Sequence, residues 1–251
     1  MGIATSSAYG KARWMSRKET TAFLSPRHTG LALSPALRLS QDASFRNLAL
    51  IAPTGSGKTT RYVIPNLLQL AGSAVVTDPS GEIYRATSGS LARQGFRIQV
   101  LQPAKVDRSL RFNPLACFRS EQELRRLAGV LAEGSAGADP FWTIGATNIL
   151  SLVLRALVAS GNPRFENLAN ARWLLNHIAA ERAGVSRFMA AHLDELGFAE
   201  FKAFLAQDEK VIASILSAAR AALDLWSDPD IARLTATHSI DIAGLRERPT
   251  V

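Results

Sequence analysis

The stretch LALIAPTGSGKTT, residues 48–60, decides how the first half of the chain folds. An apolar run ends in a glycine-rich turn, and a helix-like segment, 58–70, follows it. The turn fits the phosphate-loop pattern, with Ala52 where the stricter pattern has glycine. Small residues let backbone amides surround phosphate oxygens, and a helix that begins there directs the positive end of its dipole at the anion. The stretch therefore predicts a strand, a phosphate-binding loop and a helix.

Seven consecutive residues carry the predicted nucleotide contacts. The ammonium of Lys58 is expected on the β- and γ-phosphates, and the hydroxyl of Thr59 is expected to ligate Mg²⁺. ATP and Mg²⁺ are therefore the expected cofactors. The competing interpretation is a glycine-rich turn with an exposed lysine and no ligand. The residues assigned to nucleotide binding are Thr54, Gly55, Ser56, Gly57, Lys58, Thr59 and Thr60.

Strand-like and helix-like segments alternate around the loop. The runs 73–78 and 96–101 are rich in β-formers, and a second helix-like segment, 80–94, lies between them. This order predicts parallel strands joined by right-handed crossovers, which is a doubly wound α/β sheet. Pro65 lies inside the first helix and is expected to kink it or end it early.

Asp78 closes the second β-rich run and has two interpretations. At the carboxyl edge of a parallel sheet, its carboxylate would hold Mg²⁺ or a water beside the loop. Alternatively, Asp78 and Ser80 cap the helix that follows. No later apolar run ends in the acidic residues that ATPases of this class use to hold Mg²⁺ and polarise water. Catalytic residues are therefore not assigned, and nucleotide binding without hydrolysis stays open.

Helical periodicity replaces the strand signals after residues 113–115. Apolar stripes predict helices over 121–132, 141–158 and 167–178, and one further stripe runs from Phe204 to Trp226. The segment 141–158 carries Asn148 and Arg155, so a buried helix is expected there and no transmembrane segment is expected in the chain. The expected organisation is a basic arm with one short hairpin (1–46), a nucleotide-binding α/β part (47–115), an all-α domain (116–240) and the start of a return to the sheet (241–251).

The composition excludes several classes of protein. A hydrophobic fraction of 47% with 20% charged residues is not that of a disordered chain, a collagen or a coiled-coil rod. The single cysteine, Cys117, excludes an internal disulfide framework. Four scattered histidines show no metal-ligand spacing. Trp142, Trp173 and Trp226 lie on apolar helical faces and are expected in the core, whereas Trp14 lies among basic residues.

The net charge of +8 is unevenly distributed. Residues 1–46 hold seven Lys or Arg against two Asp or Glu, and residues 47–115 hold eight against three. Residues 116–251 hold fourteen against sixteen. The basic first half therefore predicts DNA binding with a steep salt dependence, and the alternative is a solvated surface that keeps the protein soluble.

These motifs, in this order, resemble those of the type IV secretion coupling proteins, the TraG/TraD-like motor ATPases of bacterial conjugation. The resemblance covers nearly the whole chain and is specific because the segments keep the family's order. The matching segments are 10–14 (GKARW), 52–59 (APTGSGKT), 63–68 (VIPNLL), 75–82 (VVTDPSGE), 112–115 (FNPL), 141–142 (FW) and 245–250 (LRERPT).

The resemblance implies a RecA-like P-loop motor domain, here with only part of its parallel sheet, followed by an all-α domain that meets the substrate. It implies a homo-hexamer at the cytoplasmic face of the bacterial inner membrane. The partners it implies are a relaxase–DNA complex or a secreted protein, and the inner-membrane components of the secretion channel. Because family members begin with membrane helices and continue through further strands, the chain is expected to be truncated at both ends.

Three functions remain open at this point. The first is the nucleotide-binding portion of a coupling ATPase that recruits relaxase–DNA or protein substrates and drives their transfer with ATP. The second is a non-enzymatic recognition fragment that docks a secretion partner and does not hydrolyse ATP. The third, an unrelated nucleotide enzyme such as a kinase, is disfavoured because the helical part offers no evident phosphate-acceptor chemistry.

Overall fold

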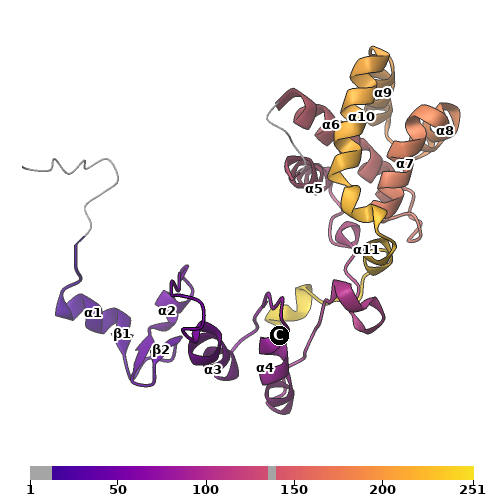
Figure 1. The fold of residues 1–251 in the computed structure, drawn as a ribbon. Coiled ribbons are helices and arrows are strands. Elements are labelled where there is room, and N and C mark those ends of the chain that lie inside the picture. Colours follow the sequence, from indigo (N-terminus) through magenta and orange to yellow (C-terminus); the bar gives the residue numbers. More distant parts are fainter. Residues whose placement is uncertain (1–12, 135–139) are drawn as a thin grey trace, which may run out of the picture. The chain divides into compact units, whose positions relative to one another are not determined.

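The computed structural model describes residues 13–134 and 140–251, and the first residues of the GKARW segment lie outside this part. The chain forms two compact units, each described by itself (Figure 1). The first unit comprises the residues up to Ile98 together with Ala243–Val251. The second unit comprises Gln99–Ile242. The fold is mixed α/β, because strands occur in the first unit and the second is built from helices.

The N-terminal part of the first unit is a small antiparallel sheet. Its strands lie in the order β1-β3-β2, and β2 and β3 form a hairpin across Pro35 and Ala36. This confirms the short hairpin expected from the sequence. Strand β1 and helix α1, which precede the hairpin, were not predicted. The elements are α1 (Arg17–Phe23), β1 (Leu24–Ser25), β2 (Ala32–Ser34), β3 (Leu37–Leu39) and α2 (Gln41–Ser44).

The helix after the phosphate loop begins as a π turn, Thr59–Val63, and continues as α3, Ile64–Leu68. Pro65 has no N–H group and cannot donate to the carbonyl four residues earlier. The N–H of Ile64 donates to the carbonyl of Thr59, five residues earlier, which widens the turn just before the proline. The predicted irregularity at Pro65 is therefore confirmed. The second predicted helix is α4, Glu82–Arg93.

The predicted parallel sheet is not shown. Within the described ranges, the segments 48–51, 73–78 and 96–101 form no ladder with one another. A parallel strand is normally covered on both faces, whereas Ile51 and Val75 are 92% and 86% exposed. The parallel contact that does form is a bridge between Arg97 and Thr250.

Residues 249–251 run between two of those segments. The N–H of Arg97 donates to the carbonyl of Pro249 at 2.9 Å, and the N–H of Val251 donates to the carbonyl of Arg97 at 2.9 Å. On the other side, the N–H of Ala74 donates to the carbonyl of Thr250 at 3.0 Å. The end of the chain thus lies beside residues 74 and 97 in the first unit.

The second unit is a helical bundle around α6 (Figure 1). Its hydrophobic core draws buried side chains from α5 to α10 and from Leu115. The helices predicted over 121–132, 141–158 and 167–178 are confirmed as α5, α6 and α7. The helices are α5 (Glu121–Glu133), α6 (Pro140–Ala159), α7 (Leu168–Ala180), α8 (Arg182–His192), α9 (Glu195–Leu205), α10 (Glu209–Ala222) and α11 (Pro229–Leu234), with short 3₁₀ turns at Pro103–Arg108, Pro114–Ala116, Asp224–Ser227 and, in the first unit, Ala243–Arg246.

Helix α6 is the one described helix that is long and apolar enough to cross a membrane. Its second half is buried against neighbouring helices, including Leu150, Leu154 and Leu157, which are at most 1% exposed. The expectation of a buried core helix is confirmed.

The apolar stripe from Phe204 to Trp226 is divided between three elements. Helix α9 ends at Leu205, and Asp208 starts α10 by accepting the N–H of Lys210 at 2.9 Å. The stripe ends in the 3₁₀ turn that contains Trp226. Apolar periodicity alone does not mark such a break, because the core face continues across it.

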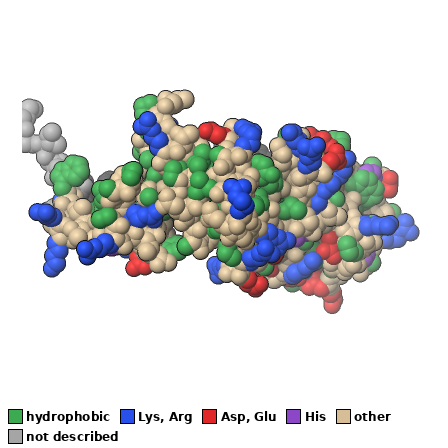
Figure 2. Space-filling model, turned by 90° about the horizontal axis from the view of Figure 1, so that it is seen from below, with side chains coloured by type: hydrophobic (Ala, Val, Ile, Leu, Met, Phe, Trp, Pro, Cys, Tyr) green, Lys and Arg blue, Asp and Glu red, His purple; other side chains and the backbone are tan. Residues whose placement is uncertain are grey.

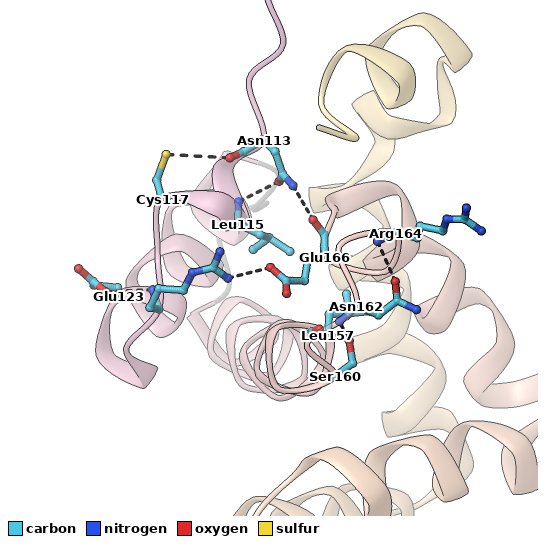
Figure 3. A network of polar contacts seen from close by, with 10 residues as sticks. Asn113, Leu115, Cys117, Glu123, Leu157, Ser160, Asn162, Arg164 and Glu166 are labelled. Atoms are coloured by element: carbon cyan, nitrogen blue, oxygen red, sulfur yellow. Dashed lines mark hydrogen bonds and ion pairs between the residues drawn. The ribbon is translucent and has the colours of Figure 1, made fainter. Parts of the chain in front are cut away.

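Asn113 ties the entry of the helical unit to the turn between α6 and α7 (Figure 3). It is 4% exposed, and its side-chain oxygen accepts the N–H of Leu115 at 3.0 Å while its amide donates to the carbonyl of Glu166. Arg119 adds an ion pair of 2.7 Å to the carboxylate of Glu166. The FNPL segment therefore holds the start of the helical unit against the turn between α6 and α7 through the buried side chain of Asn113.

Replacement of Asn113 by alanine should lower the free energy of unfolding of the helical unit by about 2 kcal/mol, because the buried N–H of Leu115 and the partly buried carbonyl of Glu166 lose their partner. Asn176→Ala, on the exposed face of α7, is the matched control and should change it by less than about 0.5 kcal/mol. Urea denaturation followed by helical circular dichroism measures both. Equal midpoints for the two variants would contradict the assigned role of Asn113.

Candidate functional site

The phosphate loop, residues 52–59, turns through two glycines in the left-handed region. Gly55 has φ of +79° and Gly57 has φ of +85°. Other L-residues rarely adopt these angles, so glycine is required at both turns. A Cβ on Gly57 would also lie 3.1 Å from Cδ of Arg61. The sequence therefore folds here into a tight loop that leads directly into the π turn.

Several amides of this loop have no protein partner. Within the described part of the chain, the N–H groups of Gly55, Gly57 and Lys58 donate to no other group. Ser56 uses its N–H internally, donating to the carbonyl of Pro53 at 3.3 Å. Consecutive amides left free at the start of a helix are the arrangement that binds phosphate oxygens.

The ammonium of Lys58 folds back over the start of its own loop. Nζ donates to the carbonyl of Ala52 at 2.7 Å and to the carbonyl of Pro53 at 2.8 Å. An ammonium has three N–H donors, so these two bonds leave one for another acceptor. Lys58 is thereby held at the loop and is partly buried.

The two threonines after Lys58 differ in their contacts. The hydroxyl of Thr60 donates to the carbonyl of Gly57 at 3.4 Å. The hydroxyl of Thr59 makes no hydrogen bond to any described residue. The structure brings Thr54 to Thr60 together in one loop and helical turn, as their adjacency in the sequence requires.

Asp78 lies in a different segment and has its own partners. One carboxylate oxygen accepts the N–H of Tyr84 at 2.9 Å, and the other accepts the hydroxyl of Ser80 at 3.3 Å. Ser80 in turn accepts the N–H of Glu82 at 3.2 Å. The interpretation of Asp78 and Ser80 as caps of the second helix is confirmed. No hydrogen bond or ion pair between described residues links Asp78 to the loop.

Two contacts near the loop were not predicted from the sequence. Asn66 pairs with Ala32 in both directions, accepting its N–H at 2.7 Å and donating to its carbonyl at 2.9 Å. This joins α3 to strand β2. The side chain of Arg61 lies against Gly57, and its guanidinium is exposed. The Asn66–Ala32 pair has no sequence signal, because it depends on which segments meet in space, whereas the contact between Arg61 and Gly57 is local to one helical turn.

Other site chemistries are not assembled in the parts that the structure describes. Within residues 13–134 and 140–251, no group of three or more His, Cys, Asp and Glu side chains could hold a metal ion. His177 and His192 bond through Nδ1 to carbonyls one helical turn earlier, at 2.8 and 2.9 Å. These two histidines therefore have local structural partners.

Charge differs between the two units in the way the sequence predicts. On the face drawn in Figure 2, basic side chains outnumber acidic ones at the left end, which holds the N-terminal part of the chain. Over the helical unit, basic and acidic side chains are interspersed. Trp14, beside Arg13 and Arg17, is 97% exposed. A surface for a polyanion is therefore available in the first unit.

The comparison with protein families decides the classification. The model of the type IV secretory system conjugative DNA transfer family matches residues 4–251. The chain belongs to this family. The match includes the phosphate loop, the FNPL segment with Asn113, and all the described helices of the second unit.

Curated relatives of the chain agree with this classification. Protein VirD4 of Rhizobium radiobacter is 26% identical over 80% of this chain and 30% of its own length. Conjugal transfer protein TraG of Escherichia coli is 26% identical over 90% of this chain and 41% of its own length. Protein VirD4 of Agrobacterium fabrum is 28% identical over 80% of this chain and 31% of its own length. The chain thus spans between about a third and two fifths of the relatives it matches.

Proposed function

We propose that this chain is the nucleotide-binding portion of a type IV secretion coupling ATPase, which recruits relaxase–DNA or protein substrates to the secretion channel and drives their transfer with ATP. The observation that carries the proposal is the loop 52–59, with its free amides and the partly buried ammonium of Lys58. Membership of the conjugative DNA transfer family supports the same conclusion.

The residues of the loop fit a magnesium nucleotide. The amides of Gly55, Gly57 and Lys58 would bind phosphate oxygens, and the remaining N–H of Lys58 would reach the terminal phosphates. The hydroxyl of Thr59 would ligate Mg²⁺, and the main-chain dipoles of the following helix would add a favourable field. Asp78 would contribute through a water, since both its oxygens already accept bonds from the cap of α4.

The bound nucleotide would supply the free energy for transfer, and the chain's own residues hold it in place. The ammonium of Lys58 would offset part of the phosphate charge, and the loop amides would donate hydrogen bonds to the phosphate oxygens. Gly55 and Gly57 allow the backbone to approach the phosphates closely. We propose that in the complete motor the segments 48–51, 73–78 and 96–101 are strands of one RecA-like parallel sheet, with residues 249–251 between the last two. The hydrogen bonds of residues 249–251 to Ala74 and Arg97 support this arrangement.

The direct test is isothermal titration of the chain with a non-hydrolysable ATP analogue in the presence of Mg²⁺. We expect saturable binding to one site, displacement by ADP, and weaker binding when EDTA removes the metal. No binding at millimolar analogue would overturn the proposal. Phosphate release measured alongside reports separately whether this chain hydrolyses ATP.

The remaining parts of the proposal concern the complete protein. We propose a homo-hexamer at the cytoplasmic face of the inner membrane, in contact with inner-membrane components of the channel. The basic first unit would contact DNA, and the all-α unit would contact the relaxase or the secreted protein. The relatives, a conjugal transfer protein among them, support the connection to DNA transfer.

A second candidate is a recognition module without ATP hydrolysis. The observation that favours it is the independent hydrophobic core of the second unit, which gathers side chains from α5 to α10. Capture of a relaxase by the full chain, measured with and without ATP, distinguishes the two functions. Capture that ATP does not change, with no phosphate release, would favour the recognition module.

A further inference from the structure

Arg61 places a second cation against the phosphate loop. Its N–H donates to the carbonyl of Gly57 at 2.8 Å, which joins the two residues across one helical turn. The position that a Cβ on Gly57 would occupy is 3.1 Å from Cδ of Arg61 and 3.2 Å from both Cγ and Nε. The arginine side chain therefore fills the space that the missing side chain of Gly57 leaves, and its guanidinium begins beside the loop.

The guanidinium of Arg61 has its hydrogen-bonding capacity available. Within residues 13–134 and 140–251, no hydrogen bond or ion pair engages it. The sequence has no Asp or Glu between Asp42 and Asp78, so the segment around the loop offers no carboxylate. Both carboxylate oxygens of Asp78 already accept hydrogen bonds, from Tyr84 and Ser80. The described part of the protein therefore leaves this positive charge without a counterion.

The position of Arg61 is unfavourable for the helix unless an anion binds. It lies in the first turn of the continuous helical segment 59–68, where the helix dipole presents its positive end. Lys58 lies three residues earlier, and like charges at this spacing on a helix repel each other. No acidic residue lies in this turn. Two cations beside free amides thus form a site that a phosphate group would stabilise.

The two cations lie at different ends of the loop. The ammonium of Lys58 is held on the carbonyls of Ala52 and Pro53, the first residues of the loop. The side chain of Arg61 lies against Gly57, near the end of the loop. The turn between them is open, because no described atom lies within 4 Å of the position of a Cβ on Gly55. A chain of phosphates bound along the loop would therefore meet one cation at each end.

We propose that Arg61 is a second phosphate-binding residue of the loop, which holds the phosphate next to the ribose while Lys58 holds the terminal phosphates. A guanidinium can donate to two oxygens of one phosphate through parallel N–H groups, whereas an ammonium acts as a point charge. With Lys58 assigned to the terminal phosphates, the opposite end of the loop receives the phosphate nearer the ribose. The inference rests on the proposed function, because it concerns the same nucleotide site.

The test is calorimetric titration of the full chain with a non-hydrolysable ATP analogue and with ADP, each in the presence of Mg²⁺. Arg61→Gln should weaken the binding of both nucleotides by the same factor of about ten, because both contain the phosphate next to the ribose. Lys58→Ala, by contrast, should weaken the ATP analogue more than ADP. Arg61→Lys keeps the charge without the planar donor group and should recover part of the lost affinity.

Arg93 provides the matched control. It is exposed in the last turn of α4, and its Nη1 is 3.7 Å from the position of a Cβ on Gly89, four residues earlier. Arg93→Gln removes the same charge from the same unit and should leave both affinities unchanged. A second readout is the melting temperature. The free Arg61→Gln chain should melt no lower than the wild type, since an unfavourable charge is removed, and ADP should raise its melting temperature less.

Wild-type affinity for both nucleotides in Arg61→Gln would overturn the inference and leave the proposed function standing. A loss confined to the ATP analogue would also overturn it, because the affected phosphate would then be the terminal one. Reduced affinity for duplex DNA with unchanged nucleotide binding would assign Arg61 to DNA instead. Absence of nucleotide binding by the wild-type chain would overturn the proposed function, and this inference with it.

Discussion

Replacement of Lys58 by alanine should lower the affinity of the chain for Mg²⁺–ATP by about two orders of magnitude. The loss combines one charged hydrogen bond with the electrostatic attraction of an ammonium that the loop holds beside its free amides. Calorimetric titration measures the affinity. The loss of affinity for ADP should be smaller than that for ATP, because ADP lacks the γ-phosphate that Lys58 is expected to contact.

Two controls separate lost binding from a distorted loop. Lys58→Gln retains an N–H donor for the carbonyls of Ala52 and Pro53 but carries no charge, and it should lose nearly as much affinity as Lys58→Ala. Lys105→Ala removes an exposed lysine elsewhere and should bind as the wild type does. Wild-type affinity in both Lys58 variants would place the nucleotide away from this loop.

DNA affinity should fall by about 100-fold between 50 mM and 200 mM salt if roughly four phosphates are contacted. The reason is that each contact between a phosphate and a lysine or arginine releases condensed counterions. Because the basic excess lies in residues 1–115, we expect these contacts in the first half of the chain. Fluorescence anisotropy with a labelled duplex, repeated over a series of salt concentrations, gives the slope.

A matched pair of double variants tests that location. Arg17→Gln with Lys18→Gln removes two exposed charges from α1. The slope of log affinity against log salt concentration should fall by about the amount that two phosphate contacts contribute. Arg125→Gln with Arg126→Gln removes two exposed charges from α5 and should leave the slope unchanged. The same slope in all three proteins, or an affinity that ignores salt, would contradict DNA binding through the first half.

Sequence patterns anticipate the parts of this structure that local chemistry determines. The helices α5, α6 and α7 follow from their apolar stripes, the irregular turn follows from Pro65, and the cap of α4 follows from Asp78 and Ser80. Each of these depends on neighbours within a few residues. The loop 52–59 belongs to the same group, since its glycines and Lys58 are adjacent in the chain.

The remaining features depend on which distant segments meet. Strands of two or three residues, such as β1 and β3, show no alternation that could be recognised. A parallel sheet containing 73–78 and 96–101 depends on residues 249–251, which lie between them and are distant in the sequence, and on cover over both faces. Trp173 lies on an apolar helical face and yet lines a groove, because the side chains packed around α7 leave that part of the face open.

The two-way pairing of Asn66 with Ala32 has a mechanical consequence. The side-chain amide of Asn66 takes the place of a neighbouring strand's backbone. Its two hydrogen bonds join the small antiparallel sheet to the helix that follows the phosphate loop. Force on residues that precede the hairpin would reach the nucleotide loop within about two helical turns, without passing through the all-α unit. If the loop binds a triphosphate as proposed, tension on the hairpin should change the affinity of that site.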